Sequence, residues 1–184
     1  MPLTNIDTPR LILQHLSAWN TEDLLEYHSD PRVIRYIPWI RRTRTDVEQA
    51  LAHYENSRDK LQHEGDFIVL GWALKTTGKI IGQSNVSLIS KDNKTADIGW
   101  VTNRAFWRKG FALEATSCLL TTVFKQSDLH RLVANIDVRN PESAALAIKL
   151  GMRKEGEFKQ SVYSKGEWCD MWQYAILRDE VAIL

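Results

Sequence analysis

The sequence predicts a single α/β (α+β) domain in which a mixed β-sheet carries helices on its faces. Two kinds of segment alternate along the chain. In one, apolar residues occupy every second position, and in the other they recur at helical spacing. In the second half a strand twice precedes a helix, an order that favours a mixed sheet covered by helices. No internal repeat, low-complexity tract or linker divides the chain, so residues 1–184 are expected to form one domain.

The first third of the chain predicts one strand followed by two helices. Residues 10–16, RLILQHL, have strand character. Residues 20–30 open with a capping residue and acidic side chains, and Pro31 ends this helix. A longer amphipathic helix starts at Asp46. Its apolar residues recur at helical spacing: Val47, Ala50, Leu51, Tyr54 and Leu61.

The middle of the chain changes period. Residues 66–90 contain two β-rich runs around the turn Thr76-Thr77-Gly78-Lys79, which predicts a hairpin. A third strand follows over residues 95–101, TADIGWV, and a helix is expected from about Phe111 to Lys125.

The last third predicts a strand, a helix and a second hairpin. Residues 131–138, RLVANIDV, read as a strand, and residues 140–151 as a helix with proline near its start and glycine at its end. Residues 155–177 predict two strands around Lys165-Gly166. The whole order amounts to about seven strands and about four helices.

Composition excludes several classes of protein. Apolar residues make up 43% and charged residues 26%, as in ordinary soluble domains. No apolar run approaches the roughly 18 residues of a membrane helix, and the N-terminus lacks a secretory signal pattern, so we expect a cytoplasmic protein without membrane contact. Lysine and arginine total 24 against 23 acidic residues, a balance that argues against direct nucleic-acid binding. The histidines and cysteines show no metal-ligand spacing, so no metal is expected.

Residues 107–115, WRKGFALEA, place two cations and a glycine at the start of a predicted helix. The first N–H groups of a helix have no partner within it, and with the helix dipole they favour an anion. Gly110 would let the backbone approach a ligand closely. Neither a P-loop nor a G-x-G-x-x-G pattern is present. By themselves, these residues fit a phosphate site and a solvated helix start equally well.

The chain resembles the GNAT acyltransferase superfamily, and within it the ribosomal-protein N-terminal acetyltransferases (RimJ/RimL). That family has a pyrophosphate loop Q/R-x-x-G-x-G/A, which residues 107–112 fit from Gly110 onward, with Trp107 in the Gln/Arg position. Further similar segments are spread over nearly the whole chain in the family's order. They are TPRLIL, SDPRVIRYIPW, GKIIGQ, ADIGW and NPESAALAIKLGMRKEGEF.

The resemblance implies a GNAT fold, with a twisted, mostly antiparallel mixed sheet of about seven strands flanked by about four helices. It also implies transfer of an acetyl group from acetyl-CoA to an amine. The residues expected to hold acetyl-CoA by this resemblance are Trp100, Val101, Thr102, Trp107, Arg108, Lys109, Gly110, Phe111, Ala112, Leu113, Asn140 and Ser143.

Asp97 is the carboxylate that we expect to act as general base, because it lies on the strand leading to the loop, where the family usually has Glu. A surface aspartate after the turn KDNK is the alternative. The resemblance places Asn140 and Ser143 beside the pantetheine, with the serine protonating the departing thiolate; helix capping explains the same pair locally. The position seven residues after Asn140, where many relatives carry a tyrosine acid, is Ala147.

The acceptor amine is the least determined part of this prediction. By resemblance it would be flanked by residues 36–42 and 163–168, with Tyr36, Trp39 and Trp168 as its walls, although core packing is an alternative for Trp39. A protein or peptide N-terminal α-amine is the first expectation. A small-molecule amine and a catalytically silent acyl-CoA-binding module are the alternatives, and a monomer and a homodimer are both compatible with the sequence.

Overall fold

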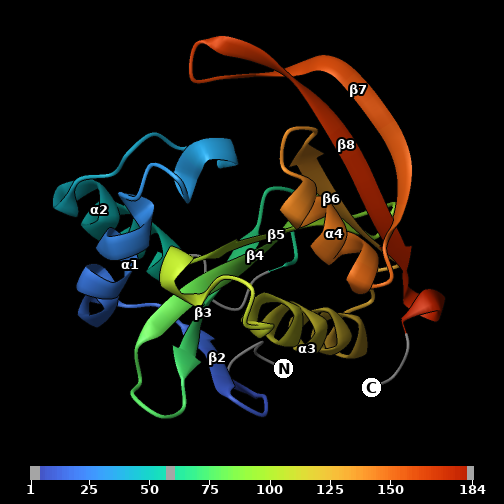
Figure 1. Ribbon diagram of the computed structural model, residues 1–184. Helices are drawn as coiled ribbons and strands as arrows, with labels where there is room; N and C mark the ends of the chain where they lie inside the picture. Colours follow the sequence, from blue (N-terminus) through green and yellow to red (C-terminus); the bar gives the residue numbers. More distant parts are fainter. Residues whose placement is uncertain (1–4, 57–60, 182–184) are drawn as a thin grey trace.

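The computed structural model describes residues 5–56 and 61–181, and its centre is one eight-stranded sheet of order β1-β2-β3-β4-β5-β6-β8-β7 (Figure 1). The strands are β1 (Ile6–Asp7), β2 (Leu11–His15), β3 (Phe67–Leu74), β4 (Ile80–Ser90), β5 (Thr95–Thr102), β6 (Arg131–Asp137), β7 (Arg153–Ser164) and β8 (Glu167–Leu177). The α-helices are α1 (Thr21–His28), α2 (Arg44–Asn56), α3 (Phe111–Gln126) and α4 (Pro141–Lys149). The predicted mixed sheet with four helices is confirmed, and the short β1 is the strand that the sequence did not predict.

The pairing of β5 with β6 differs from all the other strand pairs. Every other neighbouring pair is antiparallel, whereas β5 and β6 run parallel. Their pairing joins only Thr95, Ala96 and Asp97 to residues 131–133. Beyond Asp97 the two strands diverge, as Figure 1 shows. The backbone edges facing this gap belong to strands inside the sheet, so the ladder between β5 and β6 is interrupted there.

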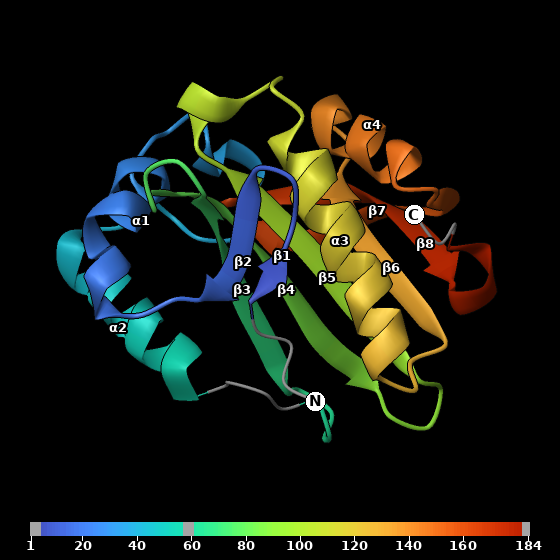
Figure 2. The same cartoon turned by 90° about the horizontal axis from the view of Figure 1, so that it is seen from below.

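Two hydrophobic cores lie on opposite faces of the sheet, because successive strand residues point to opposite sides. Leu70 and Trp72 of β3 belong to the larger core, which α3 and α4 cover. Val69 belongs to the smaller core, which contains Tyr27 and Val47 from α1 and α2. Figure 2 shows α3 lying across the sheet and α1 and α2 grouped at the β2–β3 side. The β6–β8 part of that second face therefore extends beyond the helices.

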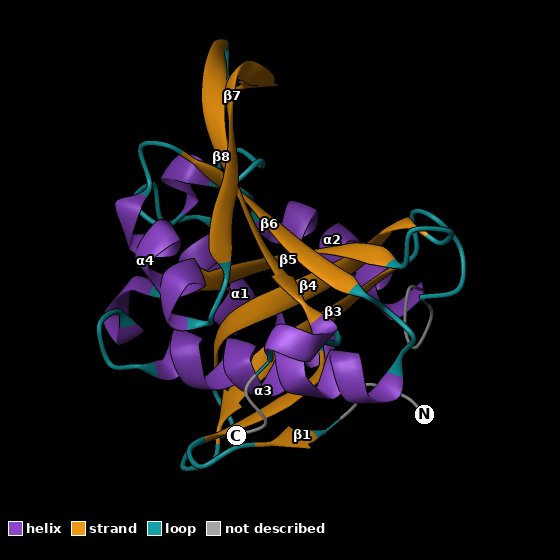
Figure 3. Cartoon of the chain, turned by 90° about the vertical axis from the view of Figure 1, so that its right-hand side faces the viewer, coloured by secondary structure: helices purple, strands orange, loops and turns teal. Residues whose placement is uncertain are grey.

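The β7–β8 hairpin projects from the rest of the molecule (Figure 3). Nearly all residues of β7 are exposed, since it forms the edge of the sheet. At the hairpin turn the Lys165 ammonium group donates hydrogen bonds to the carbonyl oxygens of Ile34 and Arg35. Within the described residues, no helix is both long and apolar enough to cross a membrane.

One predicted helix is shorter than expected. Helix α2 begins at Arg44 and ends at Asn56, so Leu61, which has the helical spacing, does not lie on it. Leu61 instead packs against the larger core from an irregular segment. The prediction that Leu61 lies on this helix is therefore wrong, because α2 ends before it.

Candidate functional site

The start of α3 presents a row of backbone donors that the fold leaves free. Gly110 precedes the helix with φ 80° in the left-handed region, where a residue without Cβ is least strained. Among the described residues, no acceptor receives a hydrogen bond from the N–H groups of residues 108–113. The next N–H, of Glu114, is bound to the Gly110 carbonyl oxygen at 3.1 Å. Free N–H groups at a helix N-terminus form the arrangement that binds phosphate.

Glu114 fastens this loop to the connection between β1 and β2. The Glu114 carboxylate accepts hydrogen bonds from Thr8 Oγ1 at 2.7 Å and from Arg10 N and Nε at 2.7 and 2.6 Å. Arg10 also donates to the Lys109 carbonyl oxygen at 3.0 Å and lies 4.2 Å from the Phe111 ring centroid. Burial alone would raise the pKa of Glu114, but the bonds from Thr8 and Arg10 outweigh it and lower the pKa. The loop is thus held in place before any ligand arrives.

Two side chains of the loop are committed to the loop itself. The Trp107 indole N–H donates to the Thr102 carbonyl oxygen at 2.8 Å. The Lys109 ammonium group donates to the Ala105 carbonyl oxygen at 2.8 Å and lies 5.3 Å from the Phe106 ring centroid. The predicted cation Lys109 therefore supports the loop conformation, and the backbone is the part left to face a ligand.

Two side chains at the end of β5 pack into the cores, one on each face of the sheet. Trp100 packs against the larger core, whereas Val101 is buried in the smaller one. Thr102 pairs with Gly82 of β4 and its carbonyl oxygen accepts the bond from Trp107. Binding of acetyl-CoA by Trp100 and Val101 stays a prediction, and it would use their main-chain groups, since both side chains pack into the cores.

Asp97 lies at the last β5–β6 pair, on the face opposite α3. Its neighbours Ala96 and Ile98 point into the larger core, so the alternation of the strand turns Asp97 to the open face. Its Oδ2 atom accepts a hydrogen bond from Asn135 Nδ2 at 3.1 Å. Burial raises the pKa of Asp97 to about 6, and the Asn135 bond lowers it in part. A carboxylate of this pKa is ionised at neutral pH and can still take up a proton.

Asn140 and Ser143 form the N-terminal cap of α4. The Asn140 side chain accepts a hydrogen bond from the Ser143 N–H at 3.1 Å, and Pro141 occupies the first turn. The Ser143 hydroxyl group makes no hydrogen bond to the described residues. Capping therefore accounts for Asn140, and it leaves the hydroxyl of Ser143 available to a ligand.

The three residues predicted to wall the acceptor site are not brought together in one cluster. Trp39 packs against the smaller core, with its ring 5.0 Å from that of His28, as the core-packing alternative expected. Trp168 is 59% exposed on the hairpin and pairs with Tyr163 at 5.2 Å between ring centroids. Tyr36 is the one beside the β6 terminus, because Arg139 lies 5.8 Å from its ring centroid.

A cavity of about 510 Å³ lies between the 31–41 segment, which contains Tyr36, and the hairpin turn; Tyr36 itself does not line it. Its lining residues are Pro31, Ile34, Arg35, Ile40, Arg41 and Lys165. Half of these side chains carry positive charge and none carries negative charge. Burial lowers the pKa of Lys165, whose ammonium group also bonds the Ile34 carbonyl oxygen. The cavity combines apolar walls with a cationic rim.

Sequence reasoning missed an ionic network at the end of β6. Arg139 donates to Asp137 Oδ2 at 2.6 Å and to Glu167 Oε1 at 2.7 Å. The bonds from Arg139 lower the pKa of Asp137, which is buried. No spacing in the sequence relates residue 139 to residue 167. By contrast, Asn135 was detectable as the one polar residue within the run 132–136, LVANI.

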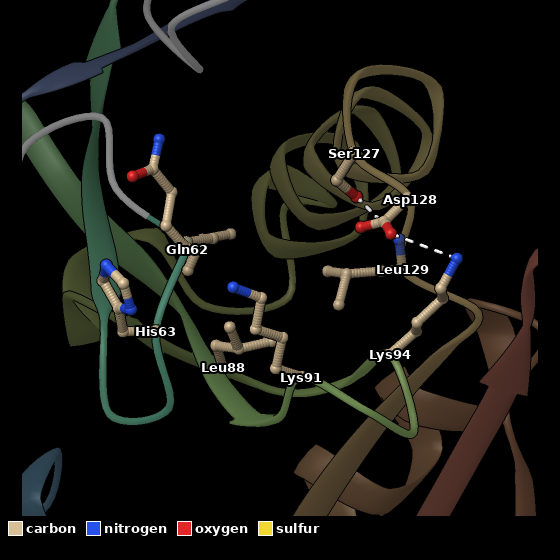
Figure 4. A pocket seen from close by; sticks show the side chains of 9 residues that line it. Gln62, His63, Leu88, Lys91, Lys94, Ser127, Asp128 and Leu129 are labelled. Atoms are coloured by element: carbon tan, nitrogen blue, oxygen red, sulfur yellow. Dashed lines mark hydrogen bonds and ion pairs between the residues drawn. The ribbon is translucent and has the colours of Figure 1, made fainter.

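A second cavity, of about 340 Å³, lies at the C-terminal end of α3 and so at the other end of that helix (Figure 4). Its rim carries the ion pair of Lys94 with Asp128, at 3.1 Å. None of the predicted site residues lines it. Within the part of the chain that the structure describes, no three His, Cys, Asp or Glu side chains are grouped so that they could hold a metal ion.

Comparison with known proteins gives a consistent result. The family model of the acetyltransferase (GNAT) domain matches residues 10–153. The uncharacterized N-acetyltransferase YnaD of Bacillus subtilis is 32% identical over 96% of this chain and 98% of its own. The crystal structure of a GNAT-family acetyltransferase from Bacillus anthracis superposes with a TM-score of 0.85 at 30% identity, covering 98% of this chain and 100% of that one. The ribosomal-protein-serine acetyltransferase of Escherichia coli is 29% identical over 55% of this chain and 56% of its own.

Proposed function

Because this chain belongs to the GNAT acetyltransferase family and is an acyltransferase, we propose that it acetylates the α-amine of a protein or peptide N-terminus. The observation that carries the proposal is the juxtaposition on β5 of two features. One end of that strand leads into the free N–H groups of residues 108–113, and its first part carries Asp97 on the open face. Donor and acceptor would then meet where β5 and β6 separate.

The donor is acetyl-CoA, the acyl donor of GNAT acetyltransferases. The residues present fit it, because its pyrophosphate requires donors and the N–H groups of residues 108–113 have no other partner among the described residues. The family resemblance places Asn140 and Ser143 beside the pantetheine arm, which would then lie at the N-terminal cap of α4. When bound, acetyl-CoA supplies an activated thioester. The N–H groups at the end of β5 would face the thioester oxygen, which gains negative charge in the transition state.

The acceptor step requires a neutral amine. The amine nitrogen forms a bond to the thioester carbon, and Asp97 takes the proton that the nitrogen loses, directly or through water. The carbon–sulfur bond then breaks, and the Ser143 hydroxyl group, which has no partner among the described residues, donates its proton to the departing sulfur. Ser143 regains a proton from solvent. Asn140 positions Ser143 through the cap of α4.

Charge at the acceptor side favours an N-terminal peptide over a polyamine. The cavity between the 31–41 segment and the hairpin turn is lined by Arg35, Arg41 and Lys165 and by no carboxylate, so it would repel a polycation. The carboxylates nearby at Asp137 and Glu167 are already paired with Arg139. The volume of the cavity, about 510 Å³, lies within the usual range for a ligand site. The cavity would accommodate residues that follow the acetylated amine.

A panel of acceptors tests the proposal. Free thiol release from acetyl-CoA is measured with peptides bearing a free α-amine, with the same peptides blocked at the N-terminus but containing lysine, with amino-acid amides and with spermidine. An α-amine is neutral far more often than a lysine amine at pH 7.5, by roughly 10²-fold, so the free peptides should react at least that much faster.

Two outcomes would contradict this assignment. Faster release with spermidine or with the amino-acid amides than with peptides would make the protein a small-amine acetyltransferase. Binding of acetyl-CoA without stimulation of thiol release by any acceptor would identify a silent acyl-CoA-binding module. The variant Asp97→Asn serves as the control for background hydrolysis in both cases.

A further inference from the structure

Asn135 and Gln173 connect Asp97 to a second strand across the open face of the sheet. The Asn135 amide donates to Asp97 Oδ2 at 3.1 Å, and the Gln173 amide donates to Asn135 Oδ1 at 3.2 Å. Asn135 and Gln173 are direct partners in the β6–β8 register. Neither residue forms part of the predicted acetyl-CoA loop or acceptor walls.

The sheet alternation places these amides on the side away from α3. Ala134 and Ile136 on either side of Asn135 belong to the larger core, so Asn135 faces the opposite way. On β8, Tyr174 belongs to the same core, and Gln173 next to it faces the open side. Asn135 is exposed there, so its polar group is not needed to fill a buried gap.

The chemistry of the three groups allows only one arrangement. An ionised carboxylate only accepts hydrogen bonds, so the Asn135 NH₂ group must face Asp97. Its carbonyl oxygen then points toward Gln173, which must present its own NH₂ group. If the Asn135 amide turned over, its oxygen would face the Asp97 carboxylate and two acceptors would oppose each other. Gln173 therefore fixes which end of Asn135 meets Asp97.

Among the described residues, no charged side chain forms an ion pair or a hydrogen bond with Asp97. Across β4 the partner of Asp97 is Ser87, and across β6 it is Val133. The Oδ1 atom of Asp97 accepts no hydrogen bond from the described residues. One oxygen is thus held by an amide, and the other is left toward the open face.

We propose that Asn135 and Gln173 are positioning residues, an amide relay that holds Asp97 by Oδ2 and turns Oδ1 toward the acceptor amine. This inference rests on the proposed function, in which Asp97 is the base. The relay also sets the pH at which Asp97 becomes ionised, because the Asn135 donor stabilises the charged form while burial opposes it.

The first test measures the Asp97 carboxyl titration by ¹³C NMR in the wild type and in Asn135→Ala. Loss of the donor should move the midpoint upward by about one pH unit. The acid limb of kcat/KM should move equally, so that activity at pH 6 falls about fivefold while activity at pH 9 is unchanged. A loss of activity that is the same at all pH values would indicate a merely structural effect and overturn the relay.

The second test uses the far end of the relay. Gln173→Leu removes the donor that fixes Asn135 and should raise the midpoint less than Asn135→Ala does. Gln173→Glu should raise it more than Gln173→Leu, because a carboxylate attracts the Asn135 NH₂ group and turns its oxygen to Asp97, and the added charge acts in the same direction. Equal midpoints for the wild type and both variants would overturn the role of Gln173.

Ser87→Ala is the matched control, since Ser87 is the neighbour of Asp97 on β4 but makes no hydrogen bond to it. Its midpoint should equal that of the wild type. The NMR titration also separates this inference from the proposed function. If Asp97→Asn keeps full kcat/KM but Asn135→Ala still moves the Asp97 midpoint, the base assignment fails and the relay stands. If Asp97→Asn is inactive and the midpoint does not move, the relay fails.

Discussion

Gly110 is the position at which a substitution would change both the backbone conformation of the loop and the charge beside its N–H groups. Its φ of 80° is one that L side chains rarely adopt, and a Cβ at this position would meet Arg10 Nη2 at 3.4 Å. Any side chain here strains the turn that aligns the free N–H groups. Lys109, one position earlier, bonds the Ala105 carbonyl oxygen and does not extend over those groups.

Gly110→Asp should weaken acetyl-CoA binding at least tenfold, because it strains the backbone and puts a negative charge where phosphate would bind. Lys109→Ala should change the dissociation constant less than about threefold, since a single exposed charge contributes little. Isothermal titration calorimetry with acetyl-CoA measures both. Equal effects of the two substitutions would mean that side-chain charge and not the backbone holds the phosphates.

The raised pKa of Asp97 would suit proton transfer, but the burial that raises it lowers the free energy of unfolding at neutral pH. Its pKa is raised from 3.8 to about 6 by burial, so the folded protein binds this proton more tightly than the unfolded chain does. The free energy of unfolding therefore falls as the pH rises between these two values. Above pH 6 the whole cost of burying the charge is present.

Asp97→Asn should consequently raise the free energy of unfolding at pH 7 by up to about 3 kcal/mol while lowering kcat/KM by about 10²–10⁴-fold. Urea unfolding at pH 7 and pH 4 measures the first effect, which should fall to about 0.5 kcal/mol at pH 4. If the substitution raises the free energy of unfolding but leaves kcat/KM unchanged, Asp97 takes no part in proton transfer.

At the scale of elements, α3 is the helix whose position determines the site. It begins at the loop proposed to bind phosphate, and it connects β5 to β6, so the position of its N-terminus relative to both strands sets the geometry of that loop. Glu114 in its first turn fixes this position through Thr8 and Arg10, residues more than 100 positions earlier in the chain. The family resemblance included TPRLIL, but only the structure shows that this segment anchors α3.

Glu114→Ala should lower the free energy of unfolding by about 2–3 kcal/mol and also weaken acetyl-CoA binding, because three hydrogen bonds to a charged group are lost. The pKa of Glu114 lies below its ordinary value of 4.5, so this contribution is present at neutral pH and is lost as the pH falls below that value. Denaturant unfolding and calorimetry measure the two effects.

Glu142→Ala is the matched control, because Glu142 occupies the first turn of α4 and has no ion pair among the described residues. Only the helix-dipole contribution, about 0.3–1 kcal/mol, should be lost there. A similar loss for both variants would show that Glu114 acts through the dipole and not through Arg10.

At the scale of the whole molecule, the order of strands and helices was predictable because each element carries a local period. The αL turn at Gly110 and the cap at Asn140 were also predictable, since both depend on neighbouring residues. Contacts between distant segments were not. The pairing of Arg139 with Glu167, and the hydrogen bond from Gln173 to Asn135, depend on the register of β8 against β6, which no local pattern encodes.

The brief parallel pairing of β5 and β6 has a mechanical consequence. Within the described residues, β5 pairs with β6 only at residues 95–97. Beside these pairs, the N–H groups of His130 and Arg131 donate to the Lys94 carbonyl oxygen, so the backbone connection between the two parts of the sheet is short. The sheet therefore consists of two parts with a short backbone connection between them, and α3 lies across that connection on one face (Figure 2). A molecule bound between the diverging strands would add contacts to both parts of the sheet. If acetyl-CoA binds there, it would therefore also strengthen the connection between the two parts of the sheet while it is bound.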